Sequence, residues 1–179
     1  LAHPLTVRGG RLMPPKPAEQ AVLQAIDRFL RTSNWLTDIQ DISFLAAGEY
    51  NANYLVSCQH ENYVFRLNQG SQLNLSNQIE YEYRVLKALE PTGVTPRAFA
   101  YDPHPAGLPG GVLLMQYLPG RALDYRQDLE KAAAIFARIH GQEVDQQEFV
   151  RQQDPVADIV RECEQLIHRY PQHPMRKER

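Results

Sequence analysis

The side chains that bind metals or act as nucleophiles are few in this sequence and stand far apart. The 179 residues contain two cysteines, Cys58 and Cys163, and neither belongs to a Cys-x-x-Cys or Cys/His cluster. A zinc site needs several such ligands at short spacing, and a disulfide framework needs more cysteines. We therefore expect neither, and unpaired thiols fit a reducing, cytoplasmic setting.

One short acidic motif, Asp128-Leu129-Glu130, has the form of a metal-binding carboxylate pair. It opens a run of residues with helical spacing. Acidic side chains commonly stand in the first turn of a helix, where they interact with the helix dipole. We therefore assign the motif no metal role, and we predict no metal ligand elsewhere in the chain.

Composition and charge indicate a globular domain and exclude several classes of partner. The chain is 43% hydrophobic and 22% charged, and its 19 basic and 21 acidic side chains give a formal net charge of −2. These values allow a hydrophobic core, and no basic patch for nucleic acid or anionic lipid stands out. No apolar run approaches the roughly 20 residues that span a bilayer. We expect a small-molecule partner, with no nucleic acid and no membrane.

Hydrophobic spacing predicts the elements that position any site. Residues 1–17 are rich in proline and glycine and indicate a flexible leader. Helical spacing is found over 18–32, 77–89, 129–140 and 155–170. Short β-rich runs cover 42–45, 54–56, 63–65, 99–101 and 112–115. The order is one helix, five strands with a helix after the third, and then two more helices.

Four segments, in this order and spacing, resemble the aminoglycoside phosphotransferase and choline kinase family, whose fold is protein-kinase-like. They are LAAGEYNANYLV at 45–56, YVFRL at 63–67, EYRVLKAL at 82–89 and VLLMQYLPG at 112–120. The resemblance implies an α+β fold. Residues 18–117 would form a kinase-like small lobe, a five-stranded antiparallel sheet with a packed helix. Residues 118–179 would form the linker and the helical start of a truncated large lobe.

The resemblance also implies a cation on the third strand that contacts the nucleotide phosphates, held by a carboxylate from the next helix. Arg66 has the cation's position, where lysine is more usual and where a planar guanidinium replaces a point charge. Glu82 is the preferred carboxylate, because Leu86 and Leu89 lie on its side of the helix. Glu80 is the alternative, and it points roughly 200° away.

Both residues also have ordinary structural interpretations. Arg66 fits an exposed arginine that lies along a strand face. Glu82 fits a surface carboxylate that pairs weakly with Arg84 or Lys87 on its own helix.

By the same resemblance, Gly48 and Asn51 lie in the loop that covers the phosphates, where small residues let backbone amides approach. The loop has one glycine and no G-x-G-x-x-G motif. Taken alone, this segment favours a tight hairpin turn with positive φ at both residues. Gln116 and Tyr117 lie in the linker, whose backbone groups bind the adenine edge, although a plain edge turn before Pro-Gly gives the same pattern.

ATP and Mg²⁺ are the cofactors that the resemblance implies. The family carries its catalytic aspartate on a His-Gly-Asp loop, but none of the six histidines here has an aspartate two residues later. We therefore predict no catalytic residue, a chain truncated before the catalytic loop, weak or absent ATP binding and no phosphate transfer by the chain alone. The alternatives are a non-enzymatic binding or regulatory module that pairs with another protein chain, and an unrelated α+β domain with the same order of segments.

Overall fold

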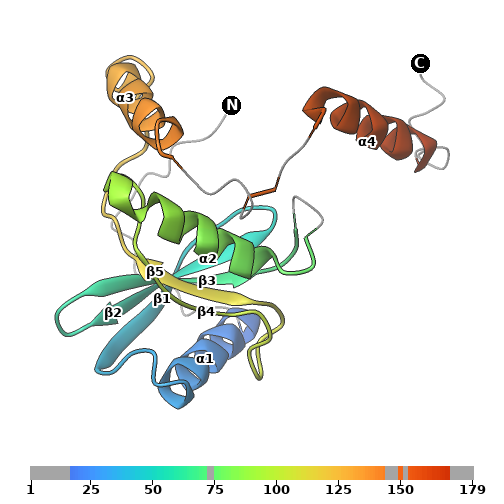
Figure 1. Ribbon diagram of the computed structural model, residues 1–179. Helices are drawn as coiled ribbons and strands as arrows, with labels where there is room; N and C mark the ends of the chain where they lie inside the picture. Colours follow the sequence, from blue (N-terminus) through green and yellow to red (C-terminus); the bar gives the residue numbers. More distant parts are fainter. Residues whose placement is uncertain (1–16, 72–74, 144–148, 151–152, 170–179) are drawn as a thin grey trace. The chain divides into compact units, whose positions relative to one another are not determined.

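The computed structural model describes residues 17–71, 75–143, 149–150 and 153–169. Every predicted helix and strand is present in this part of the chain (Figure 1). The elements are α1 (Pro17–Thr32), β1 (Ile39–Ala47), β2 (Asn51–Cys58), β3 (Asn62–Asn68), α2 (Gln78–Leu89), the 3-10 turn η1 (Glu90–Thr92), β4 (Ala98–Asp102), β5 (Val112–Gln116), α3 (Leu129–His140) and α4 (Pro155–Arg169).

The ends of the helices differ slightly from the prediction. Pro17, which we assigned to the leader, is the first residue of α1. Proline fits the first helical position, because the N–H that it lacks would have no partner there. Asn77 caps α2 rather than belonging to it, and the rest of the predicted leader and Tyr170 lie outside the described residues.

The five strands form one antiparallel sheet in the order β1-β2-β3-β5-β4. The predicted fold class is therefore confirmed. Strand β3 lies at the centre, where Arg66 pairs with Asn53 of β2 on one side and with Leu113 of β5 on the other. The backbone of Arg66 thus lies in the central strand, which has a neighbouring strand on each side.

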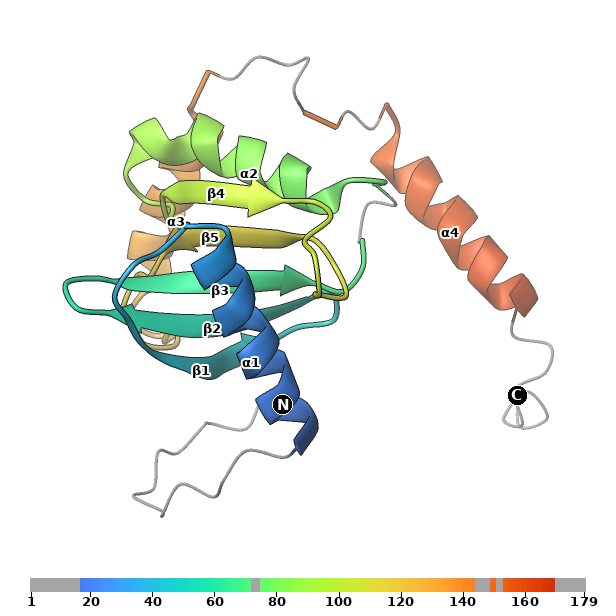
Figure 2. The ribbon, with the colours of Figure 1, turned by 90° about the horizontal axis from the view of Figure 1, so that it is seen from below.

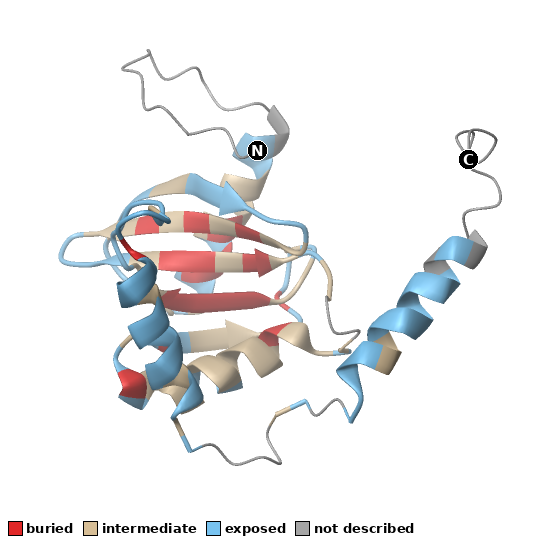
Figure 3. Ribbon diagram, turned by 90° about the horizontal axis from the view of Figure 1, so that it is seen from above, coloured by how far each residue is buried: buried red, intermediate tan, exposed pale blue. Residues whose placement is uncertain are grey.

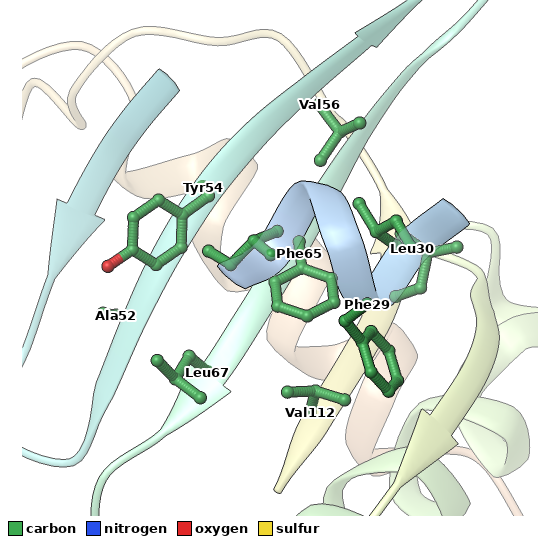
Figure 4. Close-up of a cluster of buried hydrophobic side chains, with 10 residues drawn as sticks. Phe29, Leu30, Ala52, Tyr54, Val56, Phe65, Leu67 and Val112 are labelled. Carbon is green, nitrogen blue, oxygen red and sulfur yellow. The ribbon is translucent and has the colours of Figure 1, made fainter. Parts of the chain in front are cut away.

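Helix α1 packs across one face of this sheet (Figure 2). Its residues Ile26, Phe29 and Leu30 are buried against alternate side chains of the strands. Figure 4 shows this cluster, to which the strands contribute Ala52, Tyr54, Val56, Phe65, Leu67, Val112 and Leu114. Because successive strand side chains point to opposite faces, the residues between these ones, including Asn53 and Arg66, belong to the other face.

Helix α2 packs on that second face, mainly over β4 and β5 (Figure 1). Its Ile79 is buried with Val64, Leu113 and Met115, and partly buried Tyr83, Leu86 and Tyr117 surround them. On the same face, β2 and β3 carry the polar residues Asn51, Asn53, Arg66 and Asn68. The polar part of the face therefore lies beside the helix that carries Glu82.

The helices after the sheet expose much of their apolar surface (Figure 3). Phe136 of α3 is 59% exposed and Ile159 of α4 is 60% exposed. The chain divides into two compact units, Leu1–Val144 and Asp145–Arg179, so α3 and α4 belong to different units. The predicted domain boundary after residue 117 stays a prediction. Within the described residues, no helix has the length and apolar character that crossing a membrane requires.

Candidate functional site

Arg66 forms the centre of the candidate site and is held at two of its nitrogens. Its Nη1 donates to Glu82 Oε2 at 2.7 Å, and its Nε donates to Asn53 Oδ1 at 3.0 Å. The two charged side chains are partly buried, with 26% of Arg66 and 16% of Glu82 exposed. The predicted contact between Arg66 and Glu82 is therefore confirmed. The nucleotide role of both residues stays a prediction.

Glu80, the alternative partner, lies elsewhere on α2. Its carboxylate accepts from the side chain of Asn77, and its backbone N–H donates to Asn77 Oδ1 at 3.3 Å. This reciprocal pair is a helix cap and accounts for where α2 begins. Lys87 pairs with Glu90 at 2.8 Å, which raises the pKa of Lys87. Lys87 is therefore not the partner of Glu82, which is partly buried and pairs with Arg66. The interpretation of Glu82 as a surface carboxylate paired on its own helix is wrong.

Both oxygens of Glu82 have partners. Gln78 Nε2 donates to Oε1 at 3.1 Å, and Asn51 Nδ2 approaches the same oxygen at 3.5 Å, the outer limit of a hydrogen bond. Gln78 and Asn53 were not predicted as site residues from the sequence. The spacing of Gln78, four residues before Glu82, is a signal that could have found it, because residues one turn apart are neighbours on a helix.

The turn between β1 and β2 is closed by the N–H of Gly48, which donates to the carbonyl of Asn51 at 2.9 Å. The alternative interpretation of this segment, a hairpin turn with positive φ at both residues, is wrong in its φ values. In the described backbone, positive φ occurs at Asn34, Asp38, Gly93 and Gly107. A Cβ added to Gly48 would meet nothing within 4 Å, so packing inside the chain does not require a glycine there.

Asn68, at the end of β3, ties this turn to the rest of the site. Its Nδ2 lies 3.0 Å from Asn51 Oδ1, 3.3 Å from the carbonyl of Tyr50 and 2.7 Å from that of Gly70. The N–H of Gln69 also donates to the Tyr50 carbonyl, at 2.7 Å. The side chain of Asn51 is therefore held inside the protein, between Asn68 and Glu82.

The linker residues use most of their donors within the sheet. The N–H of Gln116 donates to the carbonyl of Arg97 at 2.8 Å, and the N–H of Tyr117 donates to that of Asn62 at 3.4 Å. The side-chain oxygen of Gln116 accepts from the N–H of Arg97 at 3.3 Å. Within the described residues, Leu118 is the first after β5 whose N–H has no protein acceptor. A donor to a planar ligand would therefore come from Leu118, which the sequence did not single out.

Asp128 is occupied by protein donors. Arg121 Nη1 lies 2.7 Å from Oδ2 and Nη2 lies 2.8 Å from Oδ1, and the N–H of Asp124 donates to Oδ2 at 3.0 Å. Arg121, and then the backbone of Asp124, hold the pKa of Asp128 below its ordinary value. Among the described residues, no group of three or more His, Cys, Asp or Glu side chains could hold a metal ion.

The model of the phosphotransferase enzyme family matches residues 41–178 of the chain. No curated protein matches the chain significantly.

Two solved structures share the fold. One is spectinomycin phosphotransferase in complex with ADP and spectinomycin, with 16% identity and a TM-score of 0.51, and the match covers 80% of this chain and 46% of that one. The other is an ADP-bound aminoglycoside phosphotransferase, with 16% identity and a TM-score of 0.52, and the match covers 87% and 51%. The chain thus spans about half the length of the solved structures it matches.

Proposed function

We propose that this chain, which belongs to the phosphotransferase enzyme family, forms the nucleotide-binding lobe of an ATP-dependent small-molecule phosphotransferase. The observation that carries the proposal is the Arg66 guanidinium, which Asn53 and Glu82 fix on the polar part of the sheet face. The described contacts use Nε and Nη1, and the remaining N–H groups suit phosphate oxygens, which a guanidinium binds in a bidentate manner. The ADP in the two similar structures supports a nucleotide as the ligand.

The turn from Gly48 to Asn51 supports a phosphate site beside Arg66. It joins β1 to β2, and Asn51 connects it to both Asn68 and Glu82. The open space at Gly48 leaves the backbone accessible to a ligand. Backbone amides with no side chain in the way are suited to phosphate oxygens. In this proposal the turn covers the phosphates that Arg66 binds.

The linker supports an adenine site at the end of β5. The N–H of Leu118 is available as a donor, and a carbonyl of Gln116 or Tyr117 supplies the acceptor. Such a pair of backbone groups recognises a planar edge with little dependence on side-chain identity. Partly buried Tyr117 packs against the buried cluster that contains Met115, and it would give the adenine ring an apolar neighbour.

We further propose that the 179-residue chain alone transfers no phosphate. Phosphoryl transfer depends on positioning and on neutralising the charge of the phosphates, usually by magnesium. The sequence has no histidine followed two residues later by aspartate, and the described residues include no group of three or more His, Cys, Asp or Glu side chains that could hold a metal ion. ATP binding without turnover is the expected behaviour.

Nuclear magnetic resonance can map this site on the isotopically labelled chain. Mg-ATP should shift the backbone amides of residues 48–50, Arg66 and residues 116–118 together. AMP, which lacks the β- and γ-phosphates, should shift mainly residues 116–118. Shifts confined to the opposite sheet face, where α1 packs, would contradict the proposal.

The exposed apolar side chains of α3 and α4 favour a second candidate, a binding or regulatory module that pairs with another protein chain. They are Leu129, Ile135, Phe136, Val156, Ile159, Val160 and Ile167. Helical faces with this spacing are normally covered by a partner. Light scattering separates the candidates. A binding module should form complexes with another protein chain, whether or not ATP binds. Ile159→Glu should dissociate these complexes, and Glu162→Gln should leave them intact.

A further inference from the structure

We infer that Gln78 is a positioning residue, which holds Glu82 so that the Arg66 guanidinium keeps one orientation. The contacts that carry this inference do not depend on a nucleotide. Its consequence for phosphate binding rests on the proposed function.

A chain of hydrogen bonds leads to Glu82, and every donor in it points the same way. The N–H of Leu75 donates to Ser71 Oγ at 2.8 Å, and the Ser71 hydroxyl donates to Gln78 Oε1 at 2.8 Å. Gln78 Nε2 then donates to Glu82 Oε1 at 3.1 Å. A backbone N–H can only donate, so the hydrogen of the Ser71 hydroxyl is left for Gln78. Ser71 therefore fixes which end of the Gln78 amide faces the carboxylate.

The carboxylate of Glu82 has a separate donor on each oxygen, Gln78 on Oε1 and Arg66 on Oε2. Rotation of the carboxylate would break both bonds. Asn51, at 3.5 Å from the same Oε1, makes a longer and weaker hydrogen bond than Gln78 at 3.1 Å. Only 16% of the Glu82 side chain is exposed, so water replaces a lost donor poorly. Hydrogen bonds that run in one direction and end on a charge also strengthen one another.

The orientation of Arg66 follows from the orientation of Glu82. The guanidinium is planar, and its advantage over an ammonium for binding phosphate depends on where its plane points. Asn53 fixes Nε, and Glu82 fixes Nη1. Gln78 thus acts on a bound phosphate through two other side chains, without touching it. The cap of α2 uses Asn77 and Glu80 instead, so replacing Gln78 leaves the start of the helix intact.

Three variants of the full 179-residue chain test this role. Gln78→Glu keeps the size of the side chain but replaces the donor by a carboxylate. Gln78→Ala removes the side chain, and Ser71→Ala removes the hydroxyl that orients the amide from outside the helix. Gln24→Glu makes the same chemical change as Gln78→Glu at an exposed position of α1 and serves as the matched control.

The readout is the exchange with water of the Arg66 Nη1–H proton that donates to Glu82, measured by nuclear magnetic resonance on folded protein. Both Gln78 variants should exchange about fivefold faster than the wild type, Ser71→Ala about twofold faster, and Gln24→Glu at the wild-type rate. Unchanged exchange in Gln78→Glu and Ser71→Ala would overturn the inference. If the Gln78 variants do not fold, Ser71→Ala decides alone.

A titration of the same samples with Mg-ATP separates this inference from the proposed function. If both hold, Gln78→Glu weakens ATP binding about fivefold while Gln24→Glu does not. If the wild type shows no shifts with Mg-ATP, the proposed function fails, and the exchange rates still judge the role of Gln78. If ATP binds normally to Gln78→Glu and exchange at Arg66 is also unchanged, Gln78 has no positioning role.

Discussion

Arg66 and Glu82 form an ion pair that differs from the surface pairs of this protein. Asp27 and Arg31 on α1 lie at a similar distance, 2.9 Å, but their side chains are 41% and 55% exposed, against 16% and 26% for Glu82 and Arg66. Exposed pairs contribute about 0–1 kcal/mol, because water screens them. In the partly buried pair, loss of one partner leaves the other charge without full hydration.

Replacing Glu82 should therefore destabilise the protein more than replacing Asp27. We expect Glu82→Ala to lower the free energy of unfolding by about 1–3 kcal/mol and Asp27→Ala by less than about 1 kcal/mol. The double variant Arg66→Met/Glu82→Ala should lose less than the sum of its single changes, since it leaves no unpaired charge. Urea denaturation measures the free energy of unfolding of the wild type and of each variant. Equal losses for Glu82→Ala and Asp27→Ala, with additive effects in the double variant, would contradict the assignment.

Sequence could predict this pair but not the residues that hold it. The family resemblance implied the cation at Arg66 and the carboxylate on the next helix, and the position of Leu86 and Leu89 favoured Glu82 over Glu80. Asn53 meets Arg66 only through the register of β2 and β3. The role of Gln78 depends on Ser71, and the donors of Gln116 and Tyr117 are used because of the strand partners they meet in three dimensions. Side-chain orientation and strand register are properties of the folded chain, and spacing does not encode them.

At the scale of elements, the connection into β5 packs closely against the end of β3. The N–H of Asn68 donates to the carbonyl of Gly111 at 2.8 Å, and a Cβ on Gly110 would lie 2.0 Å from the carbonyl oxygen of Asn68. The obstacle is backbone rather than a movable side chain. Asn68 also holds the turn beside Arg66. A side chain at residue 110 would therefore disturb the candidate site as well as the sheet.

Gly110→Ala should therefore be strongly destabilising. We expect a loss of about 2–3 kcal/mol, typical of forced shifts in a packed region. Gly120→Ala is the matched control, because a Cβ there meets nothing within 4 Å, and it should change stability by less than about 0.5 kcal/mol. Thermal or urea unfolding compares the two variants. Similar stability in both would show that β3 and the β5 connection pack less closely than described.

The ion pair between Arg121 and Asp128 stabilises the segment that leads into α3, and it should do so in a pH-dependent way. Arg121 lowers the pKa of Asp128 in the folded protein. The Asp128 carboxylate therefore takes up a proton more readily in the unfolded chain than in the folded protein. The contribution of this ion pair to stability is complete at neutral pH. It declines as the pH falls through about 4, the ordinary pKa of aspartate, and then through the lower pKa of Asp128 in the folded protein.

Hydrogen exchange at the N–H of Asp124, which donates to Asp128, reports the pH dependence of the Arg121–Asp128 ion pair. Protection relative to the intrinsic rate should fall between about pH 5 and pH 3 in the wild type. Arg121→Gln should already show low protection at neutral pH. Arg126→Gln, a control that removes a nearby exposed arginine, should keep the wild-type profile. A flat profile in the wild type would exclude this ion pair as the cause.

For the whole molecule, the proposed nucleotide contacts all come from the sheet, helix α2 and the linker. The residues proposed for the phosphates lie on β3, α2 and the turn after β1, and the linker follows β5, so these contacts reach a nucleotide from one side. A nucleotide bound to one surface keeps much of its area in water. We expect an affinity for Mg-ATP of about 1 mM, or roughly 4 kcal/mol.

Calorimetric titration with Mg-ATP of the wild type, Arg66→Met and Arg84→Met shows whether Arg66 contributes to nucleotide binding. The two variants lose the same charge, but Arg84 is exposed on α2 and, two residues after Glu82, points to the other side of the helix. The wild type and Arg84→Met should bind with the same dissociation constant of about 1 mM, and Arg66→Met should bind about tenfold more weakly or not detectably. Binding that is absent in the wild type, or that is unchanged in Arg66→Met, would contradict the assignment of this sheet face as the nucleotide site.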